Sequence, residues 1–520
     1  MFKGPDDLEL TEGGIARPLF YLSLPIVITN LLQTAYNLVD TFWLGQYSTT
    51  ALAAISFAFP MVFLLISLGL GVSVAGSVLV AQNIGAGDER AAEYAASQTM
   101  LFAVVAAIGI GAVGYVLVDD LLWVFGAEPA TLAAATAYMR VIALGLPLMF
   151  GFFVFISLMR GYGDTVTPML VMFGTVVVNL ALDPFLIFGW TIVADAPVVG
   201  TVSFPELGIV GAAYATIISR GLAMAVGLAI MFAGTRGVKI RLADMRPDAA
   251  YFKKTLDIGV PASIESTGRA ISVNAMLVVV GSFPTAVVAG YGIGVRIFSV
   301  IFLPAIAVSQ GVETMAGQNI GAKKPDRAGQ AAHFAAKAMF LILGAAGGAI
   351  FLFPEPISAV FTNDPEVIGV GAEFLRYVAL TFGCIGVIRA YTGAFRGAGQ
   401  TLIAAAIAVV FLGGIRLPVA AALAYGIGPY TLEVAGATRS LPALLPALGP
   451  PGIWWGFIVS NVAGVAIAYA WFLRGTWRGG DVRGSAGPSG KSEADADPEP
   501  ESELDPDPDR DVDVDLDVDD

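Results

Sequence analysis

Long apolar stretches recur along most of this 520-residue sequence, and each is long enough to cross a lipid bilayer. A spanning helix needs about 20 mostly apolar residues, because all its backbone hydrogen bonds must be made inside the segment. Polar, Gly and Pro clusters separate the stretches. We therefore predict twelve membrane-spanning helices, at 19–44, 52–80, 95–118, 131–158, 165–190, 208–233, 252–280, 287–315, 331–353, 367–392, 401–425 and 452–474.

The composition agrees with a membrane protein and excludes several other classes. Hydrophobic residues make up 56% of the chain and charged residues 13%, about half the charged share of a soluble protein. A single cysteine, Cys384, and a single histidine, His333, exclude a disulfide framework and any multi-histidine or multi-cysteine metal site. The sequence has no phosphate-binding loop, dinucleotide fingerprint or Ser/His/Asp set. We expect no enzyme activity, no cofactor and no nucleic-acid partner, and an ion gradient as the energy source.

The distribution of charge predicts the orientation in the membrane. Nearly all basic residues of the loops follow even-numbered spans, and Arg439 is the only Lys or Arg in a loop after an odd-numbered span. Because basic loops stay on the cytoplasmic side, we predict a multi-pass protein of the cytoplasmic membrane with both termini in the cytoplasm. From Lys491 onward, 15 acidic residues stand against Lys491 and Arg510. This acidic tail is predicted to be disordered.

An internal repeat predicts how the spans are organised. AQNIGAG at 81–87 recurs as GQNIGAK at 317–323, and RGYGDT at 160–165 recurs as RGAGQT at 396–401, both with an offset of 236 residues. Each copy holds six spans, an even number, so both copies enter the membrane in the same direction. The predicted fold is therefore all-α, with two six-helix bundles related by a pseudo-two-fold axis along the membrane normal. The predicted parts are a cytoplasmic N-terminal segment at 1–18, an N-lobe at 19–233, a cytoplasmic linker at 234–251, a C-lobe at 252–474 and the tail at 475–520.

A carboxylate lies inside the first apolar span, within PIVITNLLQTAYNLVDTFWLG at 25–45. Burying an Asp in a bilayer costs roughly 2.5–3.5 kcal/mol, so Asp40 is a functional candidate, although it can also lie near the helix end and reach the headgroups. Pro25 removes a backbone hydrogen bond and permits a bend. Three polar side chains share the helix face of Asp40, which we expect to face the bundle interior, and we predict that they bind substrate: Gln33, Tyr36 and Asn37.

A second carboxylate lies in the fifth span. Asp183 shares a helix face with Asn179, and Thr216 in the sixth span lies at a similar depth. The depths of these groups and Asp40 agree within about 6 Å, so they can meet. Carboxylate, amide and hydroxyl oxygens suit Na⁺, and they also suit a proton, because two close acids cannot both ionise cheaply in a low dielectric. A purely structural role for the acids is the alternative.

The second copy of the repeat lacks these acids. Met276 and Val419 stand 236 residues after the two aspartates, so the ion chemistry is predicted to lie in the N-lobe. The C-lobe has its own acid inside the seventh span, Glu265, with Arg269 four residues later. A local ion pair between them is the simpler interpretation.

Aromatic and methionine side chains supply a candidate surface for flat hydrophobic cations. Tyr36, Tyr138 and Met172 can bind such cations by stacking, cation–π contact and adaptable packing. Residues of these types more often belong to the core or face lipid. The loops at 191–207 and 426–451 are longer than their connections require, and we expect them to cover part of the cleft between the lobes.

The segments LLQTAYNLVDTFWLGQ, VAQNIGAGD, RGYGDT and NLALDP occur in sequence with the duplicated unit around them. This set resembles the multidrug and toxic compound extrusion (MATE) transporters, especially the DinF-like branch. The resemblance covers about residues 15–475. It implies two six-helix lobes that exchange Na⁺ or H⁺ for cationic drugs. It also implies a cation site at Asp40, Asn179, Asp183 and Thr216, a bend of the first helix near Pro25, and drug contacts near Gln33, Tyr36, Tyr138 and Met172.

The sequence thus predicts a secondary active antiporter that exports amphipathic organic cations in exchange for Na⁺ or H⁺ by alternating access. Its expected partners are the organic cation, the coupling cation and membrane lipids, and a monomer is expected. One alternative is a flippase for a lipid-linked oligosaccharide or a related lipid, which would favour a cavity lined with Arg and Lys. Another alternative is a membrane receptor or scaffold with no transport cycle.

Overall fold

The structure of the chain is a computed structural model. It describes residues 9–124, 129–196, 200–428, 430–434, 437–441 and 444–483. By its internal contacts the chain separates into two units, Met1–Gly484 and Ser485–Asp520. The second unit, which holds most of the predicted acidic tail, lies outside the described residues.

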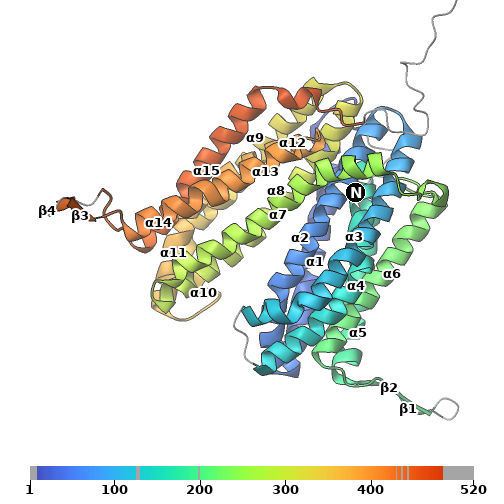
Figure 1. The fold of residues 1–520 in the computed structure, drawn as a ribbon, viewed down its shortest axis with the longest axis horizontal. Helices are drawn as coiled ribbons and strands as arrows, with labels where there is room; N and C mark the ends of the chain where they lie inside the picture. The colour runs from blue at the N-terminus through green and yellow to red at the C-terminus, as the bar shows by residue number, and fades with distance from the viewer. Residues whose placement is uncertain are drawn as a thin grey trace, which may run out of the picture. The chain divides into compact units, whose positions relative to one another are not determined.

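Six helices form the N-lobe, and each corresponds to one of the predicted apolar spans (Figure 1). Gly189 and Gly234 end the fifth and sixth helices, with φ angles of 69° and 63°. Glycine adopts this left-handed conformation at little cost, which lets the chain leave the helix there. The helices are α1 (Ala16–Tyr47), α2 (Thr49–Gly85), α3 (Glu89–Val124), α4 (Pro129–Tyr162), α5 (Val166–Phe188) and α6 (Ile209–Ala233).

The C-lobe repeats this arrangement with more interruptions. Its elements are α7 (Ala249–Gly281), α8 (Thr285–Gly321), α9 (Pro325–Leu352), the short α10 (Pro354–Ala359), α11 (Pro365–Ala379), α12 (Phe382–Gly397), α13 (Thr401–Val409), a π-helical segment Val410–Arg416, α14 (Leu417–Tyr425) and α15 (Pro450–Leu473). The tenth span, predicted as one helix, is the pair α11 and α12, which are bent by 52°. The eleventh span contains the π-helical segment, in which Gly413 and Gly414 relax the backbone.

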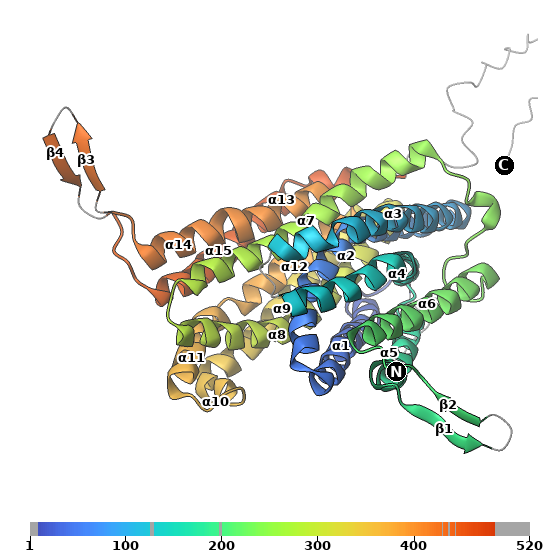
Figure 2. The ribbon, with the colours of Figure 1, turned by 60° about the horizontal axis from the view of Figure 1, so that its bottom comes forward.

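These helices account for the twelve predicted spans. Among the described residues, ten helices are each long and apolar enough to cross a membrane, and the bent pair of α11 and α12 adds one more. The remaining predicted span is the seventh, which is α7. Its charged residues Glu265 and Arg269 lower its hydropathy. Figure 1 shows α1–α6 and α7–α15 gathered in separate bundles, and in Figure 2 α4, α5 and α6 lie on one side of the molecule and α11, α14 and α15 on the other.

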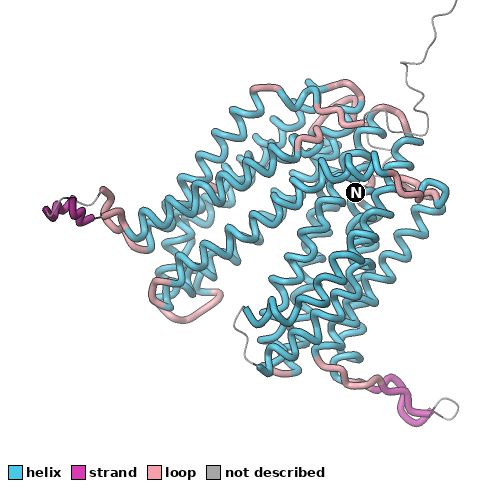
Figure 3. The backbone as a smooth tube through the Cα atoms, viewed as in Figure 1, coloured by secondary structure: helices cyan, strands magenta, loops and turns pink. Residues whose placement is uncertain are grey.

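Two β-hairpins lie in the long loops between the fifth and sixth spans and between the eleventh and twelfth (Figure 3). β1 (Thr191–Ala196) pairs antiparallel with β2 (Gly200–Ser203). β3 (Tyr430–Val434) pairs antiparallel with β4 (Ala437–Leu441), in a register that places Thr431 opposite Ser440. Apolar length could not predict these hairpins, because they lie outside the spans. We call this end of the bundles the hairpin end and the opposite end, where α1 begins and α15 finishes, the termini end.

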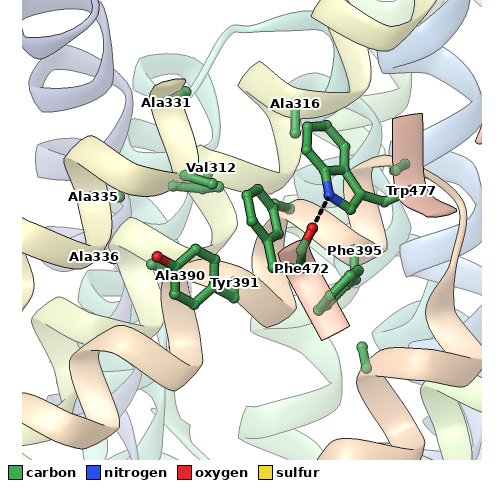
Figure 4. Packing of buried hydrophobic residues seen from close by; sticks show 14 of the residues in the cluster. Val312, Ala316, Ala331, Ala335, Ala336, Ala390, Tyr391, Phe395, Phe472 and Trp477 are labelled. Atoms are coloured by element: carbon green, nitrogen blue, oxygen red, sulfur yellow. Dashed lines mark hydrogen bonds between the residues drawn. The ribbon is translucent and has the colours of Figure 1, made fainter. Parts of the chain in front are cut away.

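The residues after α15 pack against the C-lobe instead of leaving it at 475. A short 3₁₀ turn, Thr476–Gly479, places Trp477 in the core, where it is 1% exposed. Its indole ring stacks on Phe472 with the ring centroids 4.6 Å apart, and its Nε1 donates to the Phe472 carbonyl (Figure 4). The packed chain therefore continues to at least Arg483, beyond the predicted start of the tail, because burial of Trp477 outweighs the polar residues around it.

The two lobes meet at the termini end through equivalent residues of the repeat. Nε2 of Gln82 on α2 donates to the carbonyls of Gly397 and Gly480, while Nε2 of Gln318 on α8 donates to those of Gly161 and Tyr162. A Cβ on Gly85 would lie 1.9 Å from the carbonyl oxygen of Gln318, and one on Gly321 equally close to that of Gln82. Glycine is required at both positions for this approach.

The linker between the lobes is held by the start of α3. A 3₁₀ turn at Leu242–Asp244 follows α6, and Arg90 forms an ion pair with Asp244. Asp248 caps α7 by accepting from the backbone N–H groups of Ala250 and Tyr251, and it also accepts from the Tyr94 hydroxyl. These hydrogen bonds, chiefly the one from Tyr94, hold the pKa of Asp248 below its ordinary value.

Candidate cation and substrate site

The polar face of α1 turns into the N-lobe. Asp40 is 8% exposed and Tyr36 is 2% exposed, and α1 packs against α5. Around Pro25, α1 continues as a helix, and the Thr29 hydroxyl donates to the Pro25 carbonyl at 2.8 Å.

The structure brings together the four predicted cation ligands. Thr216 Oγ1 on α6 donates to Asp40 Oδ2 at 3.4 Å, and Asn179 Nδ2 on α5 donates to Asp183 Oδ1 at 3.3 Å. The carboxyl groups of Asp40 and Asp183 are close enough to act on each other electrostatically. All four residues are buried. The shared depth inferred from sequence thus corresponds to contact between α1, α5 and α6.

Three oxygen atoms of this cluster accept no hydrogen bond from the described residues. They are Asp40 Oδ1, Asn179 Oδ1 and Asp183 Oδ2, and each is fully buried. A buried oxygen without a donor costs about 1–3 kcal/mol, and more when it carries charge. Three such acceptors around two carboxylates fit a small hard cation, for which oxygen atoms are the preferred ligands. The cluster therefore has the composition of a cation site.

A buried arginine lies one helical turn from this cluster. Arg220 follows Thr216 by four residues on α6 and is 2% exposed. Its Nη2 donates to Gln33 Oε1 at 2.7 Å, and its guanidinium lies 4.7 Å from the centre of the Tyr36 ring. No carboxylate among the described residues lies within 4 Å of it. The sequence analysis did not single out this residue, although its spacing of four from Thr216 could have found it.

The predicted substrate residues occupy two environments. Gln33 and Asn37 are half-buried, and Gln33 Nε2 donates to Asn37 Oδ1 at 3.2 Å. Tyr36, Met172 and Tyr138 are buried, with 2%, 1% and 5% exposure. The Tyr36 hydroxyl shares a hydrogen bond with Ser219. The structure therefore places Tyr36 and Met172 in one hydrophobic cluster and Tyr138 in a second.

The acids of the C-lobe are in a different situation. Arg269 Nη2 donates to Glu265 Oε1 at 3.0 Å, so the predicted local ion pair is confirmed. Arg396 on α12 joins this pair: its Nη1 donates to both Glu265 oxygens. The Nε of Arg396 also donates to Glu313 Oε2 at 2.9 Å. Met276, which stands where the repeat would place a counterpart of Asp40, is 1% exposed.

Comparisons with known proteins agree with the repeat and the fold. A family model described as MatE matches residues 25–185 and 261–422. The chain is 27% identical over 441 residues to the "Probable multidrug resistance protein YoeA" of Bacillus subtilis, covering 83% of this chain and 91% of that protein. It is 27% identical over 433 residues to the "FAD transporter" of Shewanella oneidensis, covering 83% and 92%.

Solved structures show the same arrangement of helices. A crystal structure of MATE in complex with MaL6 superposes with a TM-score of 0.78 at 24% identity, covering 91% of this chain and 98% of that one. This likeness extends across both lobes, as the two matched segments of the family model do. The chain belongs to the MatE family.

Proposed function

We propose that this chain is a secondary active antiporter that exports amphipathic organic cations in exchange for Na⁺ or H⁺. It works as a monomer in the cytoplasmic membrane, with both termini in the cytoplasm. The observation that carries the proposal is the set of buried oxygens on Asp40, Asn179 and Asp183 that no described residue satisfies. In a low dielectric, such oxygens are stabilised by a bound cation or by a proton on one carboxyl group.

The ion site and the drug site are coupled through α1. Asp40 lies one turn from Tyr36, and Tyr36 lies about one turn from Gln33, so one rigid face carries both functions. Pro25 lacks a backbone donor, which lowers the cost of bending α1 when the occupancy of Asp40 changes. Cation and drug then compete for the N-lobe because each favours a different position of this face.

Alternating access is supported by the way the lobes meet. The hydrogen bonds of Gln82 and Gln318 close the termini end and are made between lobes, so a rocking motion would break them together. A drug is pumped only if it binds the two facing states with different affinity. The name of the Bacillus subtilis relative, a probable multidrug resistance protein, supports drugs as the cargo.

The test is ethidium flux in proteoliposomes under an imposed Na⁺ gradient and, separately, an imposed pH gradient. We expect flux to follow one of the two gradients in the wild type and to be lost in Asp40→Asn, because the variant removes the charge that the cation neutralises. Asp119→Asn is the matched control, since Asp119 is an exposed carboxylate paired with Arg140 on the surface. It should retain wild-type flux.

Two results would overturn the proposal. One is a wild-type protein that moves ethidium under neither gradient. The other is an Asp40→Asn variant with the same gradient dependence as the wild type. Either result would bring the flippase hypothesis forward.

A further inference from the structure

The C-lobe holds a buried arginine near the middle of its eleventh span. Arg416 is 8% exposed and is the last residue of the π-helical segment. It stands 15 residues after Thr401 and nine before Tyr425, the ends of this span, which places it about 22 Å and 14 Å from them at 1.5 Å per residue. A charge at this depth is costly and is retained where it has a function.

The guanidinium of Arg416 is held by neutral groups. Its Nε donates to Ser460 Oγ at 3.0 Å and its Nη2 donates to Asn461 Oδ1 at 2.7 Å. Asn461 is itself fixed, because its Nδ2 donates to Thr381 Oγ1 at 2.8 Å. One face lies over the Phe457 ring, with the guanidinium carbon 4.4 Å from the ring centre. These contacts orient the group without neutralising it.

One end of the guanidinium is free. Nη1 of Arg416 donates no hydrogen bond to any residue in the described part of the chain, and it is not one of the fully enclosed atoms without a partner. No carboxylate of the described residues lies within 4 Å of Arg416. The fork is therefore oriented, charged and open at Nη1, the arrangement that binds an anionic oxygen group well.

The acids of the C-lobe described above do not compensate this charge. Glu265 and Glu313 are both engaged by Arg396, and Glu265 is also paired with Arg269. Arg269 lies on α7, against which the π-helical segment packs, and its positive charge acts on Arg416. Two guanidinium groups that repel each other raise the gain from an anion placed beside them. The residue 236 positions earlier is Leu180, so this charge is specific to the C-lobe copy.

We propose that Arg416 binds an anionic oxygen group, a carboxylate or a phosphate, of the transported amphiphile. The inference rests on the proposed function and sharpens its substrate class. The cargo is zwitterionic: its cationic part competes with the coupling ion in the N-lobe, while its anionic group binds Nη1 of Arg416. The "FAD transporter" relative shows that a phosphate-bearing cargo is compatible with this family.

The experiment measures equilibrium binding of matched dyes to the full-length purified protein by fluorescence anisotropy. Rhodamine 110 has a free carboxylate, and rhodamine 123 is its methyl ester, so the pair differs in the anionic group alone. Riboflavin 5′-phosphate and riboflavin, which carry no cationic group, form a second pair that tests the phosphate contact alone. We expect the wild type to prefer the anionic member of one pair by about ten- to a hundredfold, the usual range for a hydrogen bond to a charged group. The pair that shows the preference identifies the anion.

Variants connect the preference to Arg416. Arg416→Gln should lose the preference for the anionic dye. Arg416→Lys should lose most of it, because a lysine keeps the charge but not the planar, oriented guanidinium. Asn461→Asp keeps the arginine and supplies an internal carboxylate, so it should also lose the preference. Arg376→Gln is the control, because Arg376 is an exposed arginine of the same lobe that pairs with Glu355. It should bind as the wild type does.

The proposal is overturned if the wild type shows no preference within either pair. It is also overturned if Arg416→Gln or Asn461→Asp elutes as a folded protein and keeps the wild-type preference. Binding needs no ion gradient, so these results are separate from the ethidium flux test. A protein without coupled flux can still prefer rhodamine 110, and a coupled antiporter can still fail here.

Discussion

The two lobes share one duplicated fold, but their buried acids have different surroundings. In the N-lobe, Asp40 and Asp183 act on each other electrostatically and keep oxygens that the described residues leave without donors. In the C-lobe, Glu265 and Glu313 are bound to the guanidinium of Arg396, and of their four carboxylate oxygens Glu313 Oε1 alone lacks a donor among the described residues. Buried acids that are paired hold helices together, whereas buried acids that are not paired are available to a ligand. Burial alone does not distinguish them.

The largest predicted effect tests this distinction through stability. Arg396→Gln leaves Glu265 and Glu313 without their shared partner, which should lower the free energy of unfolding by about 3–5 kcal/mol. Asp183→Asn in the N-lobe removes a charge that has no complete set of partners, so its effect on stability should be below about 1 kcal/mol. Thermal unfolding in detergent, compared with the wild type, measures both.

The same comparison fails if the two variants behave alike. Equal destabilisation by Asp183→Asn would mean that the N-lobe acids are as structural as those of the C-lobe. Lys337→Gln is a suitable control, because Lys337 is an exposed residue of α9 outside both clusters. This variant should unfold at the same temperature as the wild type.

A smaller effect should appear when the buried arginine of the N-lobe is removed. Arg220 lies about one turn from the site of Asp40, so its positive charge lowers the affinity of that site for a cation. Arg220→Gln should tighten cation binding about tenfold, or about 1–2 kcal/mol at an effective dielectric constant near 20. The shift of the unfolding temperature with Na⁺ concentration measures this affinity.

The C-lobe supplies the matched variant for this prediction. Arg416→Gln removes an arginine of similar burial from the other lobe, and it should leave the Na⁺ dependence unchanged. A change of equal size in both variants would show a general effect of net charge. It would contradict a local action of Arg220 on Asp40.

The sequence predicted the number of helices and the grouping of Asp40, Asn179, Asp183 and Thr216 for the same physical reason. Apolar length fixes a spanning helix, and spacing of three or four fixes which side chains share its face. Residues of different helices can meet only when they lie at similar depths in their spans. Packing of α1, α5 and α6 against one another agrees with that reasoning.

The features that sequence reasoning missed depend on partners that lie far apart in the chain. Arg220 and Arg416 stand inside apolar runs where single charges are easily overlooked, and their neutral partners come from other helices. The break in the tenth span and the π-helical segment of the eleventh span leave the hydropathy of those spans unchanged. Trp477 packs on Phe472, so a segment that looks like the start of a polar tail belongs to the core.

The smallest predicted effect concerns the two copies of one motif. Gln82 and Gln318 each donate two hydrogen bonds across the lobe contact, but Gln82 Oε1 also accepts from the backbone N–H of Val482 at 2.8 Å. A net hydrogen bond contributes about 0.5–1.5 kcal/mol. Gln318→Ala should therefore favour the form open at the termini end, and Gln82→Ala should favour it slightly more.

A cysteine in place of Thr314 reports this opening, because Thr314 is 1% exposed and its hydroxyl donates to the carbonyl of Arg160 on the opposite lobe. In a Cys384→Ala background, each glutamine variant should raise the rate of labelling by a water-soluble maleimide about fivefold, the factor that corresponds to about 1 kcal/mol. Gln400→Ala is the control, since among the described residues the side chain of Gln400 bonds to Thr476, within the same half of the chain. If the labelling rates of the two variants differed by far more than one hydrogen bond explains, the two copies of the motif would not contribute equally to the closed state. The C-terminal segment at Gly480 and Val482, which contacts Gln82 and has no counterpart at Gln318 among the described contacts, would then hold the lobes together.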